Sequence, residues 1–435
     1  MLLHIVLAVV VNFTEDTAKY FLLVVIIYFL YRIFSNANKN NEVLFAAAYM
    51  AGYEVFSRMN GGAFSYEFAK YSVIGFLMIG MFFKGFNRNS WAYIFYILLL
   101  IPGIIFSVIS LNYDTKIGNA IGFNLSGPIC LGISALYCYE RKISARNLQK
   151  ILQAVLLPVI SMTVYLFLHT PSIKSIIRNT ASNFEASGGF GPNQVATVLG
   201  LGVFILFTRL FLIKDKLING IDLVLLGLVG YRAMVTFSRG GVITAVLCSL
   251  IFLAIYFLSL RSKERTSLIP KLVIISMVLV VTWLLTSFLT LGLIDKRYAN
   301  QDSLGRDKED FSTGRTELFN AELLAFYENP ITGIGVGKIK EYRLERTGVE
   351  SASHNEISRI LSEHGIFGLI AILLLIITPL ILRLKNKTNI YLYSLLMFWF
   401  LTINHSSMRI AAPAFIYGLC LLTITREKKN FIHRK

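Results

Sequence analysis

The chain has 435 residues, of which 55% are hydrophobic and only 15% are charged. Soluble globular proteins carry about 25% charged residues, so this composition excludes a soluble enzyme, a disordered chain and a secreted disulfide-bonded scaffold. The formal net charge is +17. In a membrane protein such an excess of Lys and Arg is explained by basic cytoplasmic loops, so we expect contact with membrane lipids and no nucleic-acid partner.

The apolar residues are gathered into runs of about 15 to 23 residues, and a helix of about 20 apolar residues crosses the hydrocarbon core of a bilayer. Backbone groups in lipid must be hydrogen-bonded within their own segment, so we predict that these runs are helices. The prediction is an all-α polytopic membrane protein with about 12–14 transmembrane helices and one large loop that itself contains helix. In chain order, the predicted spans cover residues 2–13, 18–34, 43–57, 64–84, 91–111, 117–139, 151–169, 192–213, 218–237, 240–259, 269–291, 366–384, 389–404 and 411–425.

Lys and Arg are divided unevenly between the two sets of loops that join these spans. One set, together with the C-terminal tail, holds 23 basic residues, and the short loops of the other set hold eight. Because basic loops stay in the cytoplasm, the C-terminus is predicted to be cytoplasmic. The large loop over residues 292–365 is then predicted to be periplasmic, that is, outside the cytoplasm.

The large loop differs from all the other connections. Its 74 residues include 13 of the 25 acidic residues of the chain, and a loop of this length tends to be functional. Within it, Thr316–Tyr327 is predicted to form an amphipathic helix, which Thr313 caps and Asn329–Pro330 ends. We therefore divide the chain into N-terminal transmembrane helices (1–187), central helices (188–291), the large loop (292–365), and C-terminal helices with a basic tail (366–435).

The first motif is Phe-Ser-Arg-Gly-Gly at residues 237–241, between two predicted spans. An arginine at a membrane boundary commonly extends its charge to the lipid headgroups. Alternatively, the Arg239 guanidinium binds a phosphate through two parallel hydrogen bonds. In that interpretation Ser238 supports the site, and the two glycines let the backbone approach closely.

The second motif, Gly314-Arg315, lies just before the predicted loop helix. One interpretation is a surface ion pair between Arg315 and Glu317 or Glu322. The other is a second cation beside a helix N-terminus, which is a favourable place to hold an anion.

The third motif is His354-Asn355, followed by nine residues that begin with Glu356 and then by Gly365-x-x-Gly368. A single histidine is usually structural. Here it precedes a segment that enters the membrane, so its neutral imidazole would lie near the headgroups and accept a proton from a sugar hydroxyl at near-neutral pH.

Polar residues within or beside the predicted spans are weaker candidates. Ionisable residues inside a membrane bundle normally pair with one another and face its interior. They line a substrate cavity or form structural ion pairs, and the sequence leaves both interpretations open. The candidates for cavity lining are Glu54, Arg58, Lys70, Asn193, His405 and Arg409.

No motif supports a cofactor or a metal. Gly-Ile-Gly-Val-Gly at residues 333–337 is similar to a nucleotide-binding loop, but no βαβ unit surrounds it, so we predict a turn. The four cysteines lie in apolar runs without metal-ligand spacing. We expect no cofactor and no metal site.

Together, Ser-Arg-Gly-Gly, Gly-Arg and His-Asn-x9-Gly-x-x-Gly resemble the O-antigen ligase and polymerase superfamily over roughly residues 188–370. The resemblance implies a GT-C-like fold and a metal-independent, inverting glycosyltransferase of the bacterial inner membrane. Such enzymes transfer a glycan from undecaprenyl diphosphate to an acceptor in the periplasm. By this resemblance, Arg239 and Arg315 hold the diphosphate of the donor, and His354 acts as the base.

The resemblance leaves the acceptor open. Ligases use the lipid A core, polymerases of O-antigen or capsular polysaccharide use the end of another repeat unit, and protein O-glycosyltransferases use Ser or Thr. We favour the ligase, with the polymerase as the nearest alternative. A transporter or flippase of lipid-linked sugars would explain the spans, but it does not explain a long outer loop that carries both the Gly-Arg and the His-Asn motif.

Overall fold

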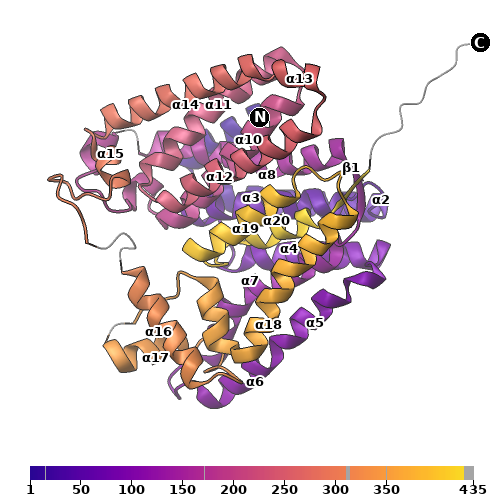
Figure 1. Ribbon diagram of the computed structural model, residues 1–435, viewed down its shortest axis with the longest axis vertical. Coiled ribbons are helices and arrows are strands. Elements are labelled where there is room, and N and C mark those ends of the chain that lie inside the picture. The colour runs from indigo at the N-terminus through magenta and orange to yellow at the C-terminus, as the bar shows by residue number, and fades with distance from the viewer. Residues whose placement is uncertain (15, 171, 310–313, 349, 426–435) are drawn as a thin grey trace, which may run out of the picture.

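Helices make up almost all of the regular structure in the computed structural model, which describes residues 1–14, 16–170, 172–309, 314–348 and 350–425 (Figure 1). The first part of the chain forms α1 (Leu2–Phe13), α2 (Thr17–Asn36), α3 (Glu42–Met59), α4 (Phe68–Lys84), the 3-10 helix η1 (Arg88–Ser90), α5 (Trp91–Leu99), α6 (Ile101–Ser110), α7 (Ile117–Cys138), β1 (Lys142–Ser144), α8 (Ala145–His169) and α9 (Ile173–Ile176). The second part forms the 3-10 helix η2 (Glu185–Ser187), α10 (Pro192–Leu212), α11 (Lys216–Val235), α12 (Arg239–Ser259), α13 (Ser262–Thr266), α14 (Ile269–Leu289), α15 (Leu293–Tyr298), α16 (Arg315–Glu328), α17 (Ile339–Thr347), α18 (Glu356–Lys385), α19 (Leu392–His405), α20 (Ala411–Cys420) and β2 (Thr423–Thr425).

Nine helical segments of the described residues are long and apolar enough to cross a membrane, which confirms a multi-pass membrane protein. The predicted number of about 12–14 spans is too high by this measure, because it includes shorter helices. For example, the predicted spans over residues 64–84 and 389–404 correspond to α4 and α19, which have 17 and 14 residues. The nine segments are Thr17–Asn36, Arg88–Ser110, Ile117–Cys138, Ala145–His169, Pro192–Leu212, Lys216–Val235, Arg239–Ser259, Ser262–Leu289 and Glu356–Lys385.

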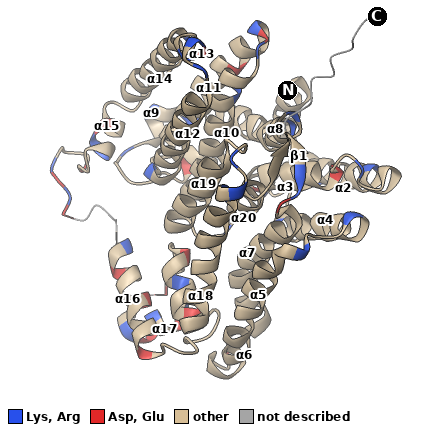
Figure 2. Ribbon diagram, turned by 45° about the vertical axis from the view of Figure 1, so that its right-hand side comes forward, with Lys and Arg blue, Asp and Glu red and all other residues tan. Residues whose placement is uncertain are grey.

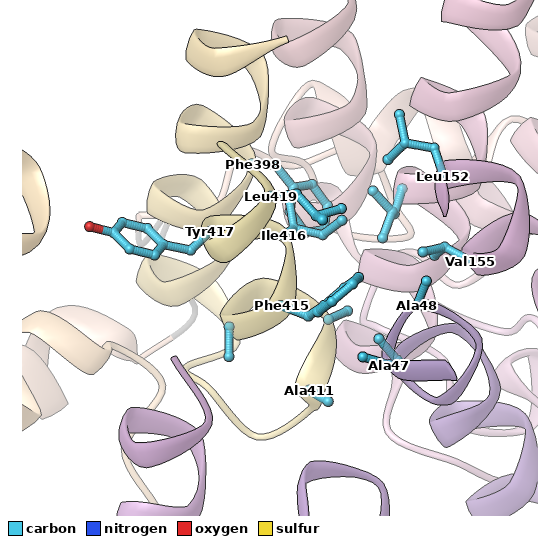
Figure 3. Packing of buried hydrophobic residues seen from close by; sticks show 14 of the residues in the cluster. Ala47, Ala48, Leu152, Val155, Phe398, Ala411, Phe415, Ile416, Tyr417 and Leu419 are labelled. Carbon is cyan, nitrogen blue, oxygen red and sulfur yellow. The ribbon is translucent and has the colours of Figure 1, made fainter. Parts of the chain in front are cut away.

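Burial separates the central helices from the peripheral ones. Most residues of α10 are buried, whereas in α14 only Ile275, Thr282 and Thr286 are buried. All residues of α20 are buried, and Figure 3 shows Phe415, Ile416 and Leu419 pointing toward α3 and α8. The bundle is therefore built around α10 and α20, whereas the exposed apolar side chains of α14 form a surface that suits contact with lipid.

The predicted span over residues 411–425 is wrong in its last part. α20 ends at Cys420, and the chain then forms β2, which pairs in parallel with β1. Two amide side chains stabilise this ending, because Asn386 and Asn389 each donate to the carbonyl of Leu422 at 3.0 Å. This small two-stranded sheet is also a departure from the all-α prediction.

α18 starts at Glu356, well before the predicted span over residues 366–384. Its first part is polar, but ion pairs from Arg359 to Glu356 and Glu363 compensate these buried charges inside the protein. A polar stretch without apolar periodicity is typical of a loop, so the sequence did not predict this short helix over residues 356–364. α18 joins two helices across a kink at Gly365, so the predicted span over residues 366–384 agrees with its second, apolar helix.

A kink in α18 receives the glycine-rich turn at residues 333–337. Gly365 has a φ of 59°, and a Cβ atom there would lie 2.5 Å from the carbonyl oxygen of Ile331. Across the same contact, the backbone N–H of Ile334 donates to the carbonyl of Ser362 at 2.8 Å. The predicted turn is thus confirmed, and Gly365 is required both by its backbone conformation and by the close approach.

The large loop contains more helix than the sequence predicted. The predicted helix over residues 316–327 is confirmed as α16, whereas α15 and α17 were not predicted. α16 and α17 pack against the first part of α18, and Figure 2 shows charged residues gathered on them while the bundle is mostly uncharged. The predicted cap of α16, Thr313, lies outside the described residues.

We expect Gly365→Ala to lower the melting temperature of the detergent-purified protein. The added methyl group meets a backbone carbonyl, and the positive φ alone costs about 1–3 kcal/mol for a residue with a side chain. Gly75→Ala is the control, because a Cβ at Gly75 meets no atom within 4 Å. Equal melting temperatures for the two variants would contradict the packing described for the kink.

Candidate active site

The Ser-Arg-Gly-Gly turn joins α11 to α12 in a strained conformation. Phe237 has a φ of 56°, which is rare for a residue with a bulky side chain. Its carbonyl accepts a hydrogen bond from Arg297 Nε at 3.0 Å, and the Ser238 hydroxyl donates to Asn193 Oδ1 at 2.8 Å. Strain of this kind persists only where the surroundings enforce it, and it is typical of functional sites.

The two glycines of this turn serve packing within the protein. A Cβ atom at Gly240 would overlap the ring of His405, and one at Gly241 would overlap the carbonyl of Ala196 in α10. His405 also lies 3.2 Å from the hydroxyl of Thr197, measured from Nε2. The close backbone approach that the sequence predicted is therefore an approach to His405 and α10.

Arg239 and Arg297 lie side by side at the start of α12. Arg239 Nη1 donates to the carbonyl of Arg297 and to Asn300 Oδ1, each at 3.4 Å. Burial, followed by the positive charges of Arg239 and Arg315, lowers the pKa of Arg297 to about 10. Three guanidinium groups are thus close enough to repel one another, and this arrangement favours the binding of an anion.

Arg315 is the first residue of α16 and follows Gly314, whose φ is 79°. Burial lowers the pKa of Arg315, and so do the positive charges of Arg239 and Arg409. Of the two predicted ion-pair partners, Glu322 binds Arg343 instead. Within the described ranges, Arg315 forms no ion pair with Glu317 either, and its guanidinium lines a cavity beside His354.

His354 lies in the segment that leads into α18, and hydrogen bonds fix the residues that follow it. The side-chain oxygen of Asn355 accepts from two backbone N–H groups of the first turn of α18, at 2.9 and 3.2 Å, and its amide donates to Asn404 at 3.0 Å. Glu356 forms an ion pair with Arg359. These two neighbours therefore have structural contacts that hold the backbone of His354.

A cavity of about 220 Å³ lies between α16 and the segment that carries His354. It brings together Arg315 and His354, two of the three residues predicted to carry the chemistry. Arg239 is not among the lining residues, but its charge acts on Arg315 from nearby. The cavity is lined by Arg315, Thr316, Leu318, Phe319, Glu322, His354, Asn355 and Asn404.

His354 is uncharged at neutral pH. Burial, followed by the positive charges of Arg409 and Arg315, lowers the pKa of this histidine from 6.5 to about 4. A neutral imidazole has one nitrogen lone pair and can accept a proton. The site therefore combines a proton acceptor with a group of cations, which suits a reaction that deprotonates a hydroxyl and releases an anion.

Glu322 of α16 is the buried centre of the contacts that hold the large loop in place. It accepts hydrogen bonds from Arg343 of α17 and from the hydroxyls of Ser353 and Ser358. Because these partners come from three parts of the chain, one carboxylate holds α16 and α17 against α18. The same contacts keep the N-terminus of α16 beside His354.

Residues 223–373 match the model of the family described as O-antigen ligase. This part of the chain is a domain of the O-antigen ligase family. It contains the Ser-Arg-Gly-Gly turn, α16, α17, His354 and the kink of α18. The family comprises O-antigen ligases and polymerases, which are glycan-transferring enzymes with lipid-linked glycan substrates. A comparison with curated proteins gives no match.

Several predicted lining residues lie outside the O-antigen ligase domain and away from its cavity. Glu54 pairs with Arg58, and Lys70 pairs with a glutamate one turn earlier, inside the helix bundle. Asn193 binds the Ser-Arg-Gly-Gly turn from α10. Arg409 adjoins the domain more closely, because it donates to the carbonyl of the residue before His354.

Sequence reasoning missed Arg297, the Glu322–Arg343 pair and the contact of Asn404 with the cavity. Arg297 lies six residues after a predicted span and is one of ten basic residues in the large loop, so nothing in the pattern distinguishes it. Glu322 was considered only as a partner of Arg315. Neither Arg297 nor Glu322 could be assigned to the site from the sequence, because each acts through contacts between distant segments of the chain.

We expect Glu322→Ala to release α16 and α17 from α18. The change leaves the buried Arg343 without its carboxylate, and breaking a buried pair in this way costs about 3–5 kcal/mol. Limited proteolysis of the purified protein should then cut the large loop faster than in the wild type. The control is Glu328→Ala, because Glu328 pairs with Arg346 at the surface, where such a pair contributes about 0–1 kcal/mol; equal cleavage in both variants would contradict the role of Glu322.

Proposed function

We propose that the protein transfers a glycan from undecaprenyl diphosphate to the lipid A core. The observation that carries this proposal is the cavity shared by Arg315 and His354, with Arg239 and Arg297 beside it. In this proposal the cavity and the large loop face the periplasm, and the C-terminus lies in the cytoplasm of a bacterial cell. The excess of basic residues on the opposite loops supports that orientation.

The arginines act on the leaving group of the donor. As the bond between the sugar and the diphosphate breaks, negative charge grows on the diphosphate. Arg239, Arg315 and the newly found Arg297 are preplaced cations that stabilise this charge, and losing one comparable donor costs about 2.7–4 kcal/mol in well-studied enzymes. We propose that the guanidinium groups supply this stabilisation without a metal ion or another cofactor.

His354 acts on the acceptor. Its neutral imidazole takes the proton of the acceptor hydroxyl, while the oxygen attacks the anomeric carbon from the side opposite the diphosphate. One carbon–oxygen bond forms and the bond to the diphosphate breaks, so the configuration at the sugar inverts. A base of this kind typically adds about 10²–10⁴-fold to the rate.

An apolar cavity beside the arginines supports a lipid-linked donor. It has a volume of about 330 Å³, lies between α10, α11, α12 and α14, and reaches Tyr298. Burial raises the pKa of Tyr298 to about 12, and the charges of Arg239 and Arg297 act on it in the opposite direction, so this tyrosine lies beside the cationic group. The apolar cavity would accommodate part of the hydrocarbon tail of the donor, and the arginines beside it would bind the diphosphate.

A polymerase of O-antigen or capsular polysaccharide is the second candidate, since the matched family includes both activities. The two functions share the donor and differ in the acceptor. In lipopolysaccharide gels, loss of a ligase leaves bare core with lipid-linked polymer accumulating, whereas loss of a polymerase leaves core with a single repeat. Offering the purified protein both acceptors separates the two directly, and movement of labelled lipid without a new glycosidic bond would favour a transporter instead.

The variants His354→Ala and Arg315→Ala are expected to lose activity in this transfer assay. Arg315→Ala should lower kcat about 10²–10³-fold through the lost stabilisation of charge, and His354→Ala about 10²–10⁴-fold through the lost base. His169→Ala and Arg306→Ala are matched controls, because both residues are exposed and lie outside the cavity. Wild-type turnover in both site variants would refute the assignment.

The pH dependence of the reaction follows from His354. Only the unprotonated base works, so kcat/KM, which reports the free protein, should stay constant through neutral pH and fall as the pH approaches about 4. The bound diphosphate offsets the positive charges of Arg315 and Arg409 and so raises the pKa of His354 in the complex. The acid limb of kcat should therefore lie at higher pH than that of kcat/KM; an acid limb of kcat/KM near the ordinary value of about 6.5 would contradict this environment.

A further inference from the structure

Residues 407–411, which comprise the last four residues between α19 and α20 and the first residue of α20, are held from one side by a buried ion pair of α3. Glu54 binds Arg58 and accepts a hydrogen bond from the backbone N–H of Ala411. Arg58 in turn donates to the carbonyl of Arg409 at 3.2 Å. Two side chains of α3 therefore fix the backbone of this segment at two points.

The same segment holds the residues around His354 from its other side. The Arg409 guanidinium donates to the carbonyl of Ser353, and the Ser407 hydroxyl donates to that carbonyl at 3.3 Å. Ser353 immediately precedes His354 in the chain. A continuous series of contacts thus runs from α3, through residues 407–411, to the backbone of the proposed base.

The Glu54–Arg58 pair is better suited to orienting the backbone groups that it binds than to stabilising the folded protein. The exposed fractions of the two side chains are 1% and 4%. A buried ion pair gains little net stability, because the cost of removing two charges from water offsets their attraction. The planar guanidinium of Arg58, however, binds three acceptors at once, namely Glu54 and the carbonyls of Arg409 and Tyr66.

We propose that Glu54 and Arg58 are positioning residues for glycan transfer. Through residues 407–411 they keep Arg409 on Ser353, and they thereby fix the orientation of His354 toward the acceptor. Neither of the two lines the cavity, so both act through the backbone of this segment. The inference rests on the proposed function, since it takes His354 as the base.

Because Arg409 lowers the pKa of His354, loss of this positioning should be visible in the pH profile of the reaction. The groups whose charges lower the pKa of His354 are Arg409, then Arg315 of α16, Arg343 of α17 and His405 of α19. Of these, Arg409 is the one whose backbone Arg58 holds. If Arg409 moves away, the pKa of His354 rises toward its ordinary value, so the acid limb of the pH profile moves to higher pH.

The test measures transfer from purified undecaprenyl-diphosphate glycan to lipid A core, and separately to a repeat-unit acceptor, by the full-length protein. A small misplacement of a catalytic group costs about 10²-fold, so Arg58→Gln and Glu54→Gln should lower kcat to about that extent. KM for the donor should change little, because the diphosphate arginines are intact, and the acid limb of kcat/KM should move to higher pH. Arg58→Lys, which restores the charge, should recover part of the activity.

Arg209→Gln is the matched control. It breaks another buried ion pair, in which Arg209 Nε lies 2.9 Å from Asp222 Oδ2, but this pair joins α10 to α11 and does not contact residues 407–411. We expect this variant to retain the kcat and the acid limb of the wild type in the folded, monodisperse fraction.

An unshifted acid limb in folded Arg58→Gln, whatever its melting temperature, overturns the positioning role. If Arg58→Gln does not fold, Glu54→Gln decides by the same criterion, because it breaks the same ion pair. His354→Ala is measured alongside. An inactive His354→Ala with an unshifted Arg58 variant defeats only this inference, whereas an active His354→Ala defeats the proposed function itself.

Discussion

The arrangement of the candidate site depends on one buried carboxylate. Glu322 receives hydrogen bonds from α17, from the segment before α18 and from α18 itself. Without these contacts, α16 would be held only by apolar packing and by more exposed contacts such as the Glu328–Arg346 pair. A charge taken out of water is unfavourable unless every lone pair finds a donor, so the carboxylate enforces a single arrangement of these elements.

Gly333 and Gly365 are both required by the packing of the turn at residues 333–337 against α18. Gly333 and Gly365 face each other across a contact in which either Cβ atom would meet backbone atoms of the other segment. The turn at residues 333–337 and Gly365 of the third motif therefore form one interface, whereas Gly368 lies against the carbonyl of Ile360 within α18. That interface directs the polar first part of α18 toward the cavity, whereas the apolar remainder continues into the bundle.

The sequence was informative wherever the cause of a structure is local. Apolar length was enough to predict helices such as α10 and α12, and two of the three motifs contain residues that line the cavity, Arg315 and His354. The sequence failed where the cause is a contact between distant segments. The polar start of α18 depends on Arg359 between two glutamates, β2 depends on β1, and Arg297 gains its significance only beside Arg239. The roles of the site residues themselves are still predictions.

The central position of α20 has a consequence for how the protein is made. α20 packs between α3 and α7, which precede it by hundreds of residues, and its first backbone N–H group satisfies Glu54. While the ribosome is still synthesising the middle of the chain, the space for α20 must hold lipid or stay collapsed, and Glu54 has Arg58 but not the backbone N–H of Ala411 as a partner. α3 and α7 can therefore reach their final packing only after α20 has joined them.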